Sequence, residues 1–330
     1  MSKKPTRSQA ATLAKKDPKD PVRILISWSP NTPGNEVIEY AAWLARSTPV
    51  RIRVVSTLSQ PLTVTSMNKL SGSYKKHFRK QSEKFASAAK KALLNAGLSK
   101  SQLDENFAIL AAGPSRPLLL TELAEDFRAD VILLGAAQSA PKGRIFAGST
   151  ADTLLHNSPL PIGIIPRGIK LSKHGVTRIN FAYTDRGNPE EPALLYAAQL
   201  AHTWGVPLRV LAFSAEGLVD VPVDTPDFSS SIALTWREHS LAMLDRAHDM
   251  VGEHFPELEV ATEIGTGEGW SGAVDSLKWK KGDLLCLGSS PLGPIERVFI
   301  GSTATKLLPH MRVPVLVRPA EGPAFEMAQA

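Results

Sequence analysis

Short apolar runs alternate with longer amphipathic stretches along most of the chain. The run RILISW at 23–28 precedes EVIEYAAWLAR at 36–46, where apolar residues recur at the spacing of a helix. This order of strand and helix continues to LPIGIIP at 160–166, starts again with RINFAYT at 178–184 and ends with VPVLVRP at 313–319. Strands that alternate with helices predict parallel sheets covered on both faces, with right-handed crossovers.

The same pattern predicts the other elements of the two stretches. The remaining expected strands are 50–57, 107–113, 130–136, 207–214, 258–265 and 283–289. The remaining expected helices are 74–96, 116–128, 191–204, 232–251, 270–279 and two that begin near residues 150 and 302. We interpret GTGEGW at 265–270 as the turn between a strand and its helix, because it lacks the third glycine of a dinucleotide fingerprint.

A sequence repeat explains the repeated pattern. The segment RIFAGSTADTLLHNSPLPIGIIP at 144–166 returns as RVFIGSTATKLLPHMRVPVLVRP at 297–319, a constant offset of 153 positions. We therefore predict two tandem domains, at 22–167 and 176–319, with a polar linker at 168–175 between them. A length of 330 residues is sufficient for two such domains, each with its own core.

Net charge and cysteine content narrow the class of protein. Seven basic and two acidic residues in 1–23 account for five of the six net positive charges. We predict a disordered basic tail at 1–21 and a short C-terminal tail at 320–330. The single cysteine, Cys286, lies in the apolar run LLCLG and is expected to be a buried packing residue. With no apolar signal and no disulfide, the sequence favours a cytoplasmic protein.

Several function classes receive no support from the residues. No apolar run is long enough to span a bilayer, and the basic helix at 74–96 is expected to be merely solvated, so we expect neither membrane nor nucleic-acid binding. His248 and His254 stand without a zinc-like set of neighbours, and no G-x-S-x-G elbow occurs. We assign no metal-binding and no catalytic residues.

A glycine-rich motif follows the fourth expected strand of each domain. Gly135 and Gly288 end these strands, and after a loop of twelve residues Gly-Ser-Thr begins a helix, as Gly148, Ser149 and Thr150 and as Gly301, Ser302 and Thr303. A glycine permits close approach of a phosphate, and a helix start offers unpaired N–H groups and partial positive charge. Lys142, Arg144 and Arg297 would add charge. The same residues are also ordinary helix caps and turn residues.

These motifs resemble those of the universal stress protein family. Its ATP-binding members carry G-x2-G-x9-G-[ST], and the segments GAAQSAPKGRIFAGS at 135–149 and GSSPLGPIERVFIGS at 288–302 keep both spacings. The second motif glycine is replaced by Gln138 in one copy and by Pro291, which has no N–H, in the other. Gly143 and Gly293 lie nearby and would restore flexibility to the loops.

A second departure concerns the aspartate that contacts the adenosine part of the nucleotide in ATP-binding members. Ser29 occupies that position in the first domain, and Asp185 follows it by one place in the second. The nucleotide-site residues that the resemblance implies are thus Ser29, Gly135, Gln138, Gly143, Gly148, Ser149 and Thr150 in the first domain, and Asp185, Gly288, Pro291, Gly293, Gly301, Ser302 and Thr303 in the second.

The resemblance implies an α/β fold of two Rossmann-like domains, related to adenine nucleotide alpha hydrolases. Each would hold a five-stranded parallel sheet of order 3-2-1-4-5 with helices on both faces. The fifth strands, at 160–166 and 313–319, are expected to pair antiparallel as an intrachain pseudo-dimer, which removes two exposed sheet edges. Further homodimers are compatible with this arrangement.

The expected function is a non-catalytic stress-response binding module with weakened ATP binding, with or without Mg²⁺, and an unknown protein partner. The alternatives are a nucleotide-independent dimerisation scaffold and a slow ATPase.

Overall fold

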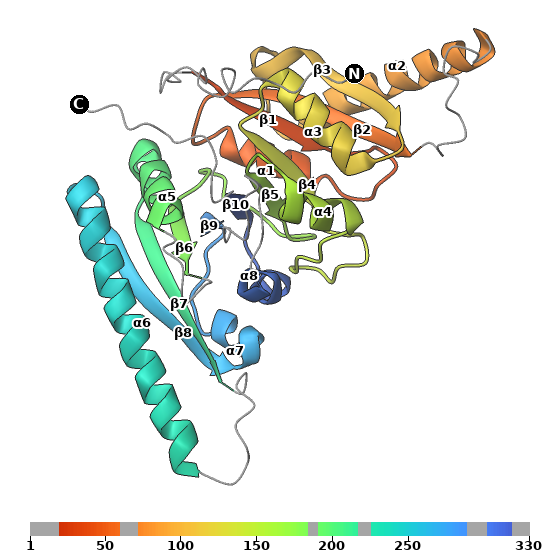
Figure 1. Cartoon of the computed structure of the whole chain (residues 1–330). Helices are drawn as coiled ribbons and strands as arrows, with labels where there is room; N and C mark the ends of the chain where they lie inside the picture. The colour runs from red at the N-terminus through yellow and green to blue at the C-terminus, as the bar shows by residue number, and fades with distance from the viewer. Residues whose placement is uncertain (1–19, 60–71, 184–190, 217–225, 289–301, 319–330) are drawn as a thin grey trace, which may run out of the picture.

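The computed structural model describes residues 20–59, 72–183, 191–216, 226–288 and 302–318 (Figure 1). The predicted tails lie outside these residues, and the domain boundaries stay a prediction. The first half of the chain contains strands β1 (Val22–Ser27), β2 (Val50–Ser59), β3 (Leu103–Gly113), β4 (Val131–Gly135) and β5 (Ile162–Ile165). Its helices are α1 (Glu36–Leu44), α2 (Gly72–Asn95), the short η4 (Lys100–Gln102), α3 (Arg116–Phe127) and α4 (Ser149–Asn157).

The second half repeats this order. Its strands are β6 (Arg178–Ala182), β7 (Leu208–Glu216), β8 (Val260–Glu268), β9 (Asp283–Gly288) and β10 (Val315–Arg318). Its helices are α5 (Glu191–Trp204), α6 (Pro226–His254), α7 (Gly269–Asp275), α8 (Ser302–Leu307) and the short η5 (Leu308–His310). The long helices α2 and α6 each follow the second strand of their half, as the sequence pattern predicts.

All ten strands form one sheet of order β3-β2-β1-β4-β5-β10-β9-β6-β7-β8. Within each half the neighbouring strands are parallel, and the order is the predicted 3-2-1-4-5. Where the halves meet, β5 and β10 pair antiparallel, with Gly163 opposite Leu316. The predicted intrachain pseudo-dimer is confirmed, and it merges two five-stranded sheets into one mixed sheet.

Helices cover both faces of this sheet (Figure 1). Because strands are buried on both sides, alternate residues enter different cores: Ile24 and Ile26 pack on one face and Leu25 on the other. The first core includes side chains of α1, α2, α5 and α6, and the second includes side chains of α3, α4, α7 and α8. Each core draws residues from both halves, so the halves share their hydrophobic interior.

The interpretation of GTGEGW as a turn is wrong. Residues 265–268 belong to β8, and α7 begins directly at Gly269. A Cβ on Gly267 would lie 2.6 Å from the carbonyl carbon of Gly272, and the φ of Gly267 is +156°. The glycines therefore allow the backbone of α7 to lie against β8, which is a packing role.

The fold resolves the expectation on the burial of the single cysteine. Cys286 lies in β9 and is a buried free thiol, as expected of a packing residue. Within the described residues, no helix is both long and apolar enough to cross a membrane.

Candidate functional site at the carboxyl edge of the first half

Sheet pairing brings the first-half motif residues to one edge. Ile26 of β1 pairs with Leu133 of β4, so the segments that follow these strands leave the sheet side by side. Ser29 follows β1, and Gly135 ends β4. The carboxyl edge of an open parallel sheet is where such folds bind ligands.

Gly135 leaves open space at this edge. Its backbone is exposed, and a Cβ built on it meets nothing within 4 Å. Gln138, which stands where the family motif has glycine, is also exposed. A ligand group can therefore approach the backbone at the end of β4 without displacing a side chain.

The loop after Gly135 uses several of its own hydrogen-bond donors. The N–H of Ala137 donates to the oxygen of Phe146 at 2.7 Å, and that of Gly143 donates to Arg167 at 2.7 Å. Other donors bonded within the chain are the N–H groups of Ala136, Ala140 and Arg144. Gly143 has a φ of +76°, a conformation that favours glycine. The loop thus folds back on itself, and these amides do not remain for a phosphate.

Arg167 holds this loop, and sequence reasoning missed it. Its Nη1 donates to the carbonyl oxygens of Gln138 at 2.9 Å and Ala140 at 3.0 Å. A guanidinium can satisfy several oxygens at once because its N–H groups point in fixed directions. The signal in the sequence was its place just after the repeat: the residue 153 positions later is Ala320, so the second copy lacks this arginine.

The start of α4 keeps its donors. Gly148 is the N-cap, and no side chain caps the helix. The first helical bond runs from the N–H of Asp152 to the oxygen of Gly148 at 2.8 Å, so the N–H groups of Ser149 and Thr150 precede it. These groups, together with the helix dipole, favour an anion at this position.

Two side chains that the sequence assigned to the site, those of Ser29 and Arg144, form hydrogen bonds within the chain. The hydroxyl oxygen of Ser29 accepts a hydrogen bond from the N–H of Asn31 at 3.4 Å, so it closes a turn after β1. Arg144, expected to add charge for a phosphate, instead donates from Nη1 to the carbonyl oxygen of His310 at 2.7 Å. This bond joins the first-half loop to η5 of the second half. Lys142 remains exposed.

The second-half motif is described only in part. Gly288 ends β9 and pairs with Arg318 of β10. Ser302 and Thr303 begin α8, as predicted, but their side chains are not described. Asp185, Pro291, Gly293, Arg297 and Gly301 lie outside the described residues.

Burial shifts the pKa values of several titratable groups near the junction of the halves toward their neutral forms. Burial raises the pKa of Cys286 to about 12, so its thiol stays protonated. Burial also raises the pKa of Tyr40, whose hydroxyl donates to the oxygen of Val315 at 3.5 Å, and that of Tyr196. Burial, followed by the nearby Arg144, lowers the pKa of His310. Within the described part of the chain, no three His, Cys, Asp or Glu side chains gather as a metal site would require.

The fold and the site define a class: a tandem pair of doubly wound α/β units with a glycine-rich loop and a helix start at the carboxyl edge. Comparison with known proteins identifies the family. The model of the universal stress protein family matches residues 9–166 and again 176–319. The chain therefore belongs to the universal stress protein family and carries two of its domains.

Known relatives agree with this assignment. Universal stress proteins of Mycobacterium tuberculosis and Mycobacterium bovis are 34% identical over 203 residues, which cover 61% of this chain and 68% of theirs. A universal stress protein from Archaeoglobus fulgidus has a similar structure, with a TM-score of 0.59, 18% identity and coverage of 90% of this chain and 96% of its own. A Pseudomonas aeruginosa protein named as a putative universal stress protein superposes with a TM-score of 0.51 at 14% identity, covering 92% of this chain and 95% of its own. These structural likenesses support the fold.

Proposed function

We propose that this protein is a non-catalytic binding module of the cytoplasmic stress response whose first half binds a nucleotide phosphate, such as that of ATP, with low affinity. The observation that carries the proposal is the uncapped start of α4 beside the open backbone of Gly135. Unpaired N–H groups at a helix start, next to a glycine without steric obstruction, are suited to a phosphate group.

The same geometry accounts for low affinity. The N–H groups of Ala137 and Gly143, which lie in the loop that would surround a bound phosphate chain, already donate within the chain. A hydrogen bond to a charged group contributes about 1.5–3 kcal/mol, so losing one weakens binding by roughly 10- to 150-fold. A micromolar nucleotide site would thus fall toward millimolar affinity. The residues fit one phosphate at the start of α4 better than a whole triphosphate cradle.

Binding at this position would be transmitted through Arg144. Its guanidinium connects the loop to His310 in the second half at 2.7 Å. A ligand that reorders the loop would strain or release this bond, and would thereby change the surface offered to a protein partner or a second chain. A ligand shifts such an equilibrium only by its difference in affinity for the two states.

The test uses the cap position itself. Gly148 has a φ of −74°, and a Cβ there would meet only the Cβ of Ala137 at 3.8 Å, so Gly148→Asp and Gly148→Asn both fit. Both side chains are good helix caps. Asp places a carboxylate where the phosphate would bind, and Asn, the matched control, places a neutral amide. In calorimetric titrations with ATP, we expect millimolar binding by the natural chain and at least tenfold weaker binding by Gly148→Asp than by Gly148→Asn.

Other outcomes separate the alternatives. Equal ATP affinity in the two variants would place the nucleotide elsewhere and overturn the proposed site. No binding and no thermal shift at millimolar ATP would favour a nucleotide-independent scaffold. Release of ADP by the natural chain, lost in Gly148→Asp, would instead favour the slow ATPase and contradict the non-catalytic role.

A further inference from the structure

Two adjoining hollows lie at the amino-terminal ends of β6, β9 and β10, at the edge of the sheet where β5 of the first half ends. The larger, of about 460 Å³, is formed by the linker on one side and the turn before β9 on the other, and a smaller one of about 170 Å³ adjoins it. Both are lined by Lys170, Leu171, Lys280 and Lys281. The larger volume falls in the range of small-molecule sites.

The backbone around the larger hollow is held by hydrogen bonds. The N–H of Ser172 donates to the oxygen of Lys281 at 2.9 Å, and the N–H of Thr177 donates to Gly282 at 2.8 Å. Just after α1, Nη1 of Arg46 donates to the oxygen of Ser172 at 2.9 Å. The linker is thereby fixed against both halves, and the lysines extend from a defined frame.

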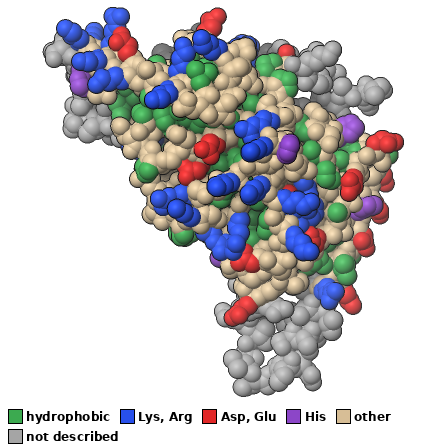
Figure 2. Space-filling view, turned by 180° about the vertical axis from the view of Figure 1, so that it is seen from behind, with side chains coloured by type: hydrophobic (Ala, Val, Ile, Leu, Met, Phe, Trp, Pro, Cys, Tyr) green, Lys and Arg blue, Asp and Glu red, His purple; other side chains and the backbone are tan. Residues whose placement is uncertain are grey.

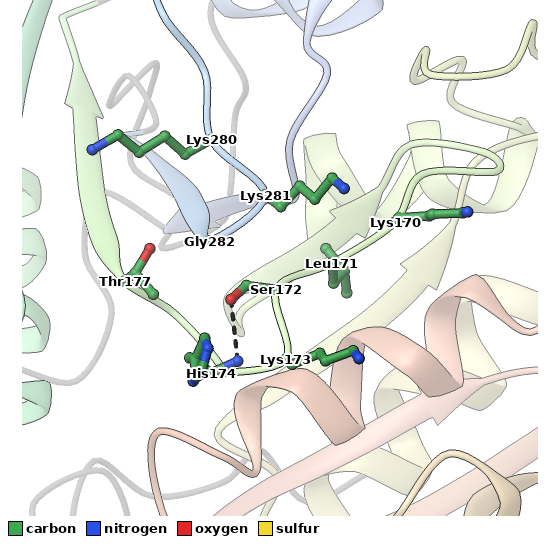
Figure 3. Close-up of a pocket in the computed structure, with 9 residues that line it drawn as sticks. All are labelled: Lys170, Leu171, Ser172, Lys173, His174, Thr177, Lys280, Lys281 and Gly282. Carbon is green, nitrogen blue, oxygen red and sulfur yellow. Dashed lines mark hydrogen bonds between the residues drawn. The ribbon is translucent and has the colours of Figure 1, made fainter.

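Basic side chains predominate among the residues that line the larger hollow. The larger hollow is lined by Lys170, Lys173, Lys280, Lys281 and His174, and it has no Asp or Glu among its lining residues. In Figure 3, Lys170, Lys173 and Lys281 extend to the same side of the linker, whereas Lys280 extends away from them. Figure 2 shows Lys and Arg side chains gathered across the middle of the opposite face from Figure 1.

These lysines have no acidic partner within the described part of the chain. The nearest buried carboxylate, Asp283, is engaged by Arg178 at 2.7 Å and by the N–H of Lys280 at 2.8 Å. Asp275, beside the smaller hollow, pairs with Arg312 at 2.9 Å. The three exposed ammonium groups of Lys170, Lys173 and Lys281 thus share a concave surface without internal neutralisation, which raises the local concentration of anions.

We propose that the hollows form a site for a small anion that carries several phosphate groups in a chain. One phosphate contacts one or two ammonium groups, whereas the spread of Lys170, Lys173 and Lys281 around Leu171 matches several linked phosphates. The site is lined by the linker and by the second half, so its ligand would also hold the linker against that half. The proposal is independent of nucleotide binding at α4.

The probe is inorganic tripolyphosphate, titrated by calorimetry into the full chain at about 0.05 M ionic strength, where screening is modest. The test variant is the double substitution Lys173→Ala and Lys281→Ala. The matched control is Lys90→Ala and Lys91→Ala, which removes the same charge from exposed positions of α2. We expect one tripolyphosphate per chain at the linker, at least tenfold weaker binding in the test variant, and less than a twofold change in the control.

Further measurements locate the binding site and distinguish a small polyphosphate from a nucleic acid. Gly148→Asp should leave this binding unchanged, and amide exchange should slow at residues 170–174 and 280–282 when tripolyphosphate is added. The same loss in test and control variants would mean diffuse attraction and would overturn the site. So would tighter binding of a short oligonucleotide through the same lysines, because the ligand would then be a nucleic acid.

Discussion

The two halves of the chain place an arginine at the same point of their sheets but surround it differently. Arg53 in β2 lies opposite Leu25 of β1, and Arg209 in β7 lies opposite Asn180 of β6. The guanidinium of Arg53 lies 4.4 Å from the ring centre of Phe127 and that of Arg209 lies 5.0 Å from that of Trp279. The arginine over an aromatic ring is therefore common to both halves.

The acidic partners differ in burial. Arg53 pairs with Asp104 and Asp126, whose side chains are 20% and 70% exposed. Arg209 donates to Asn180 and Glu263 at 2.7 Å, and its Nη2 lies 3.9 Å from the fully buried Asp283. Burial, followed by the charge of Arg178, lowers the pKa of Arg209. The duplicated fold thus keeps an arginine at the same position of the sheet. Its acidic partners are partly or largely exposed in the first half, whereas the second half adds a fully buried aspartate.

The largest expected difference concerns the aspartate at the start of the fourth strand of each half, Asp283 in β9 and Asp130 just before β4. Asp283 is fully buried and holds Arg178 through two hydrogen bonds, whereas its counterpart Asp130 is partly exposed and accepts from the N–H of Arg23. We expect Asp283→Asn to lower the free energy of unfolding by about 3–5 kcal/mol, because it leaves the largely buried guanidinium group of Arg178 uncompensated. Asp130→Asn should cost about 1 kcal/mol. Urea unfolding followed by circular dichroism measures both, and equal losses would remove the distinction.

A second comparison concerns the aromatic residues that contact these arginines, and here the larger loss of stability is expected in the first half. Phe127 is buried and contacts two guanidinium groups, of Arg53 and Arg23, whereas Trp279 is only half-buried. Phe127→Ala should cost about 3 kcal/mol through lost packing. Trp279→Ala should cost about 1–2 kcal/mol, since part of the ring is already in contact with water. The reverse order in the same unfolding assay would show that the second half depends more on its aromatic residue.

The smallest expected effect is a pH dependence of stability that arises from a residue of the second half. The position of His310 in η5 is taken by Asn157 in the first half, at the 153-residue offset. Burial and Arg144 lower the pKa of folded His310, so the unfolded chain binds its proton more readily. Stability from this group is present above the unfolded pKa of about 6.5 and is lost as the pH falls below it.

The matched test is His310→Asn, which introduces the first-half residue. We expect this variant to lose less stability than the natural chain between about pH 7.5 and about pH 5. Asn157→His, at an exposed position, should leave the pH dependence nearly unchanged. A steeper pH dependence in His310→Asn would mean that the protonated imidazole stabilises the fold.

Most of the fold was accessible from sequence patterns because burial on both faces leaves a clear signature. Apolar runs such as VILLG in β4 predict a strand without tertiary information, and the repeat predicts that whatever the first half forms, the second forms again. The error at Gly265–Trp270 arose because glycines that mark turns locally also permit close packing between a strand and a helix. Only the close contact between Gly267 of β8 and Gly272 of α7 in the folded chain distinguishes the two.

The sequence predicted where the motif residues lie in the fold, but not which hydrogen bonds form around them. Gly135, Gly148 and Ser149 lie where the motif placed them, at the carboxyl edge of the first half. The sequence did not indicate that Arg167 would bind the carbonyl oxygens of the loop, or that Arg144 would reach His310. Both side chains are long, and their partners are chosen by loop conformation and by the meeting of two halves.

The amino-acid sequence by itself determined the duplication and the succession of strands and helices, because the repeat and the local periodicity leave few alternatives, and its resemblance to the universal stress protein family implied the strand order. Tertiary structure alone decided which hydrogen-bond donors remain for a ligand and which lysines share the hollow at the linker. The physical reason is that hydrogen bonds and charges act over a few ångströms, between groups that only the folded chain brings together.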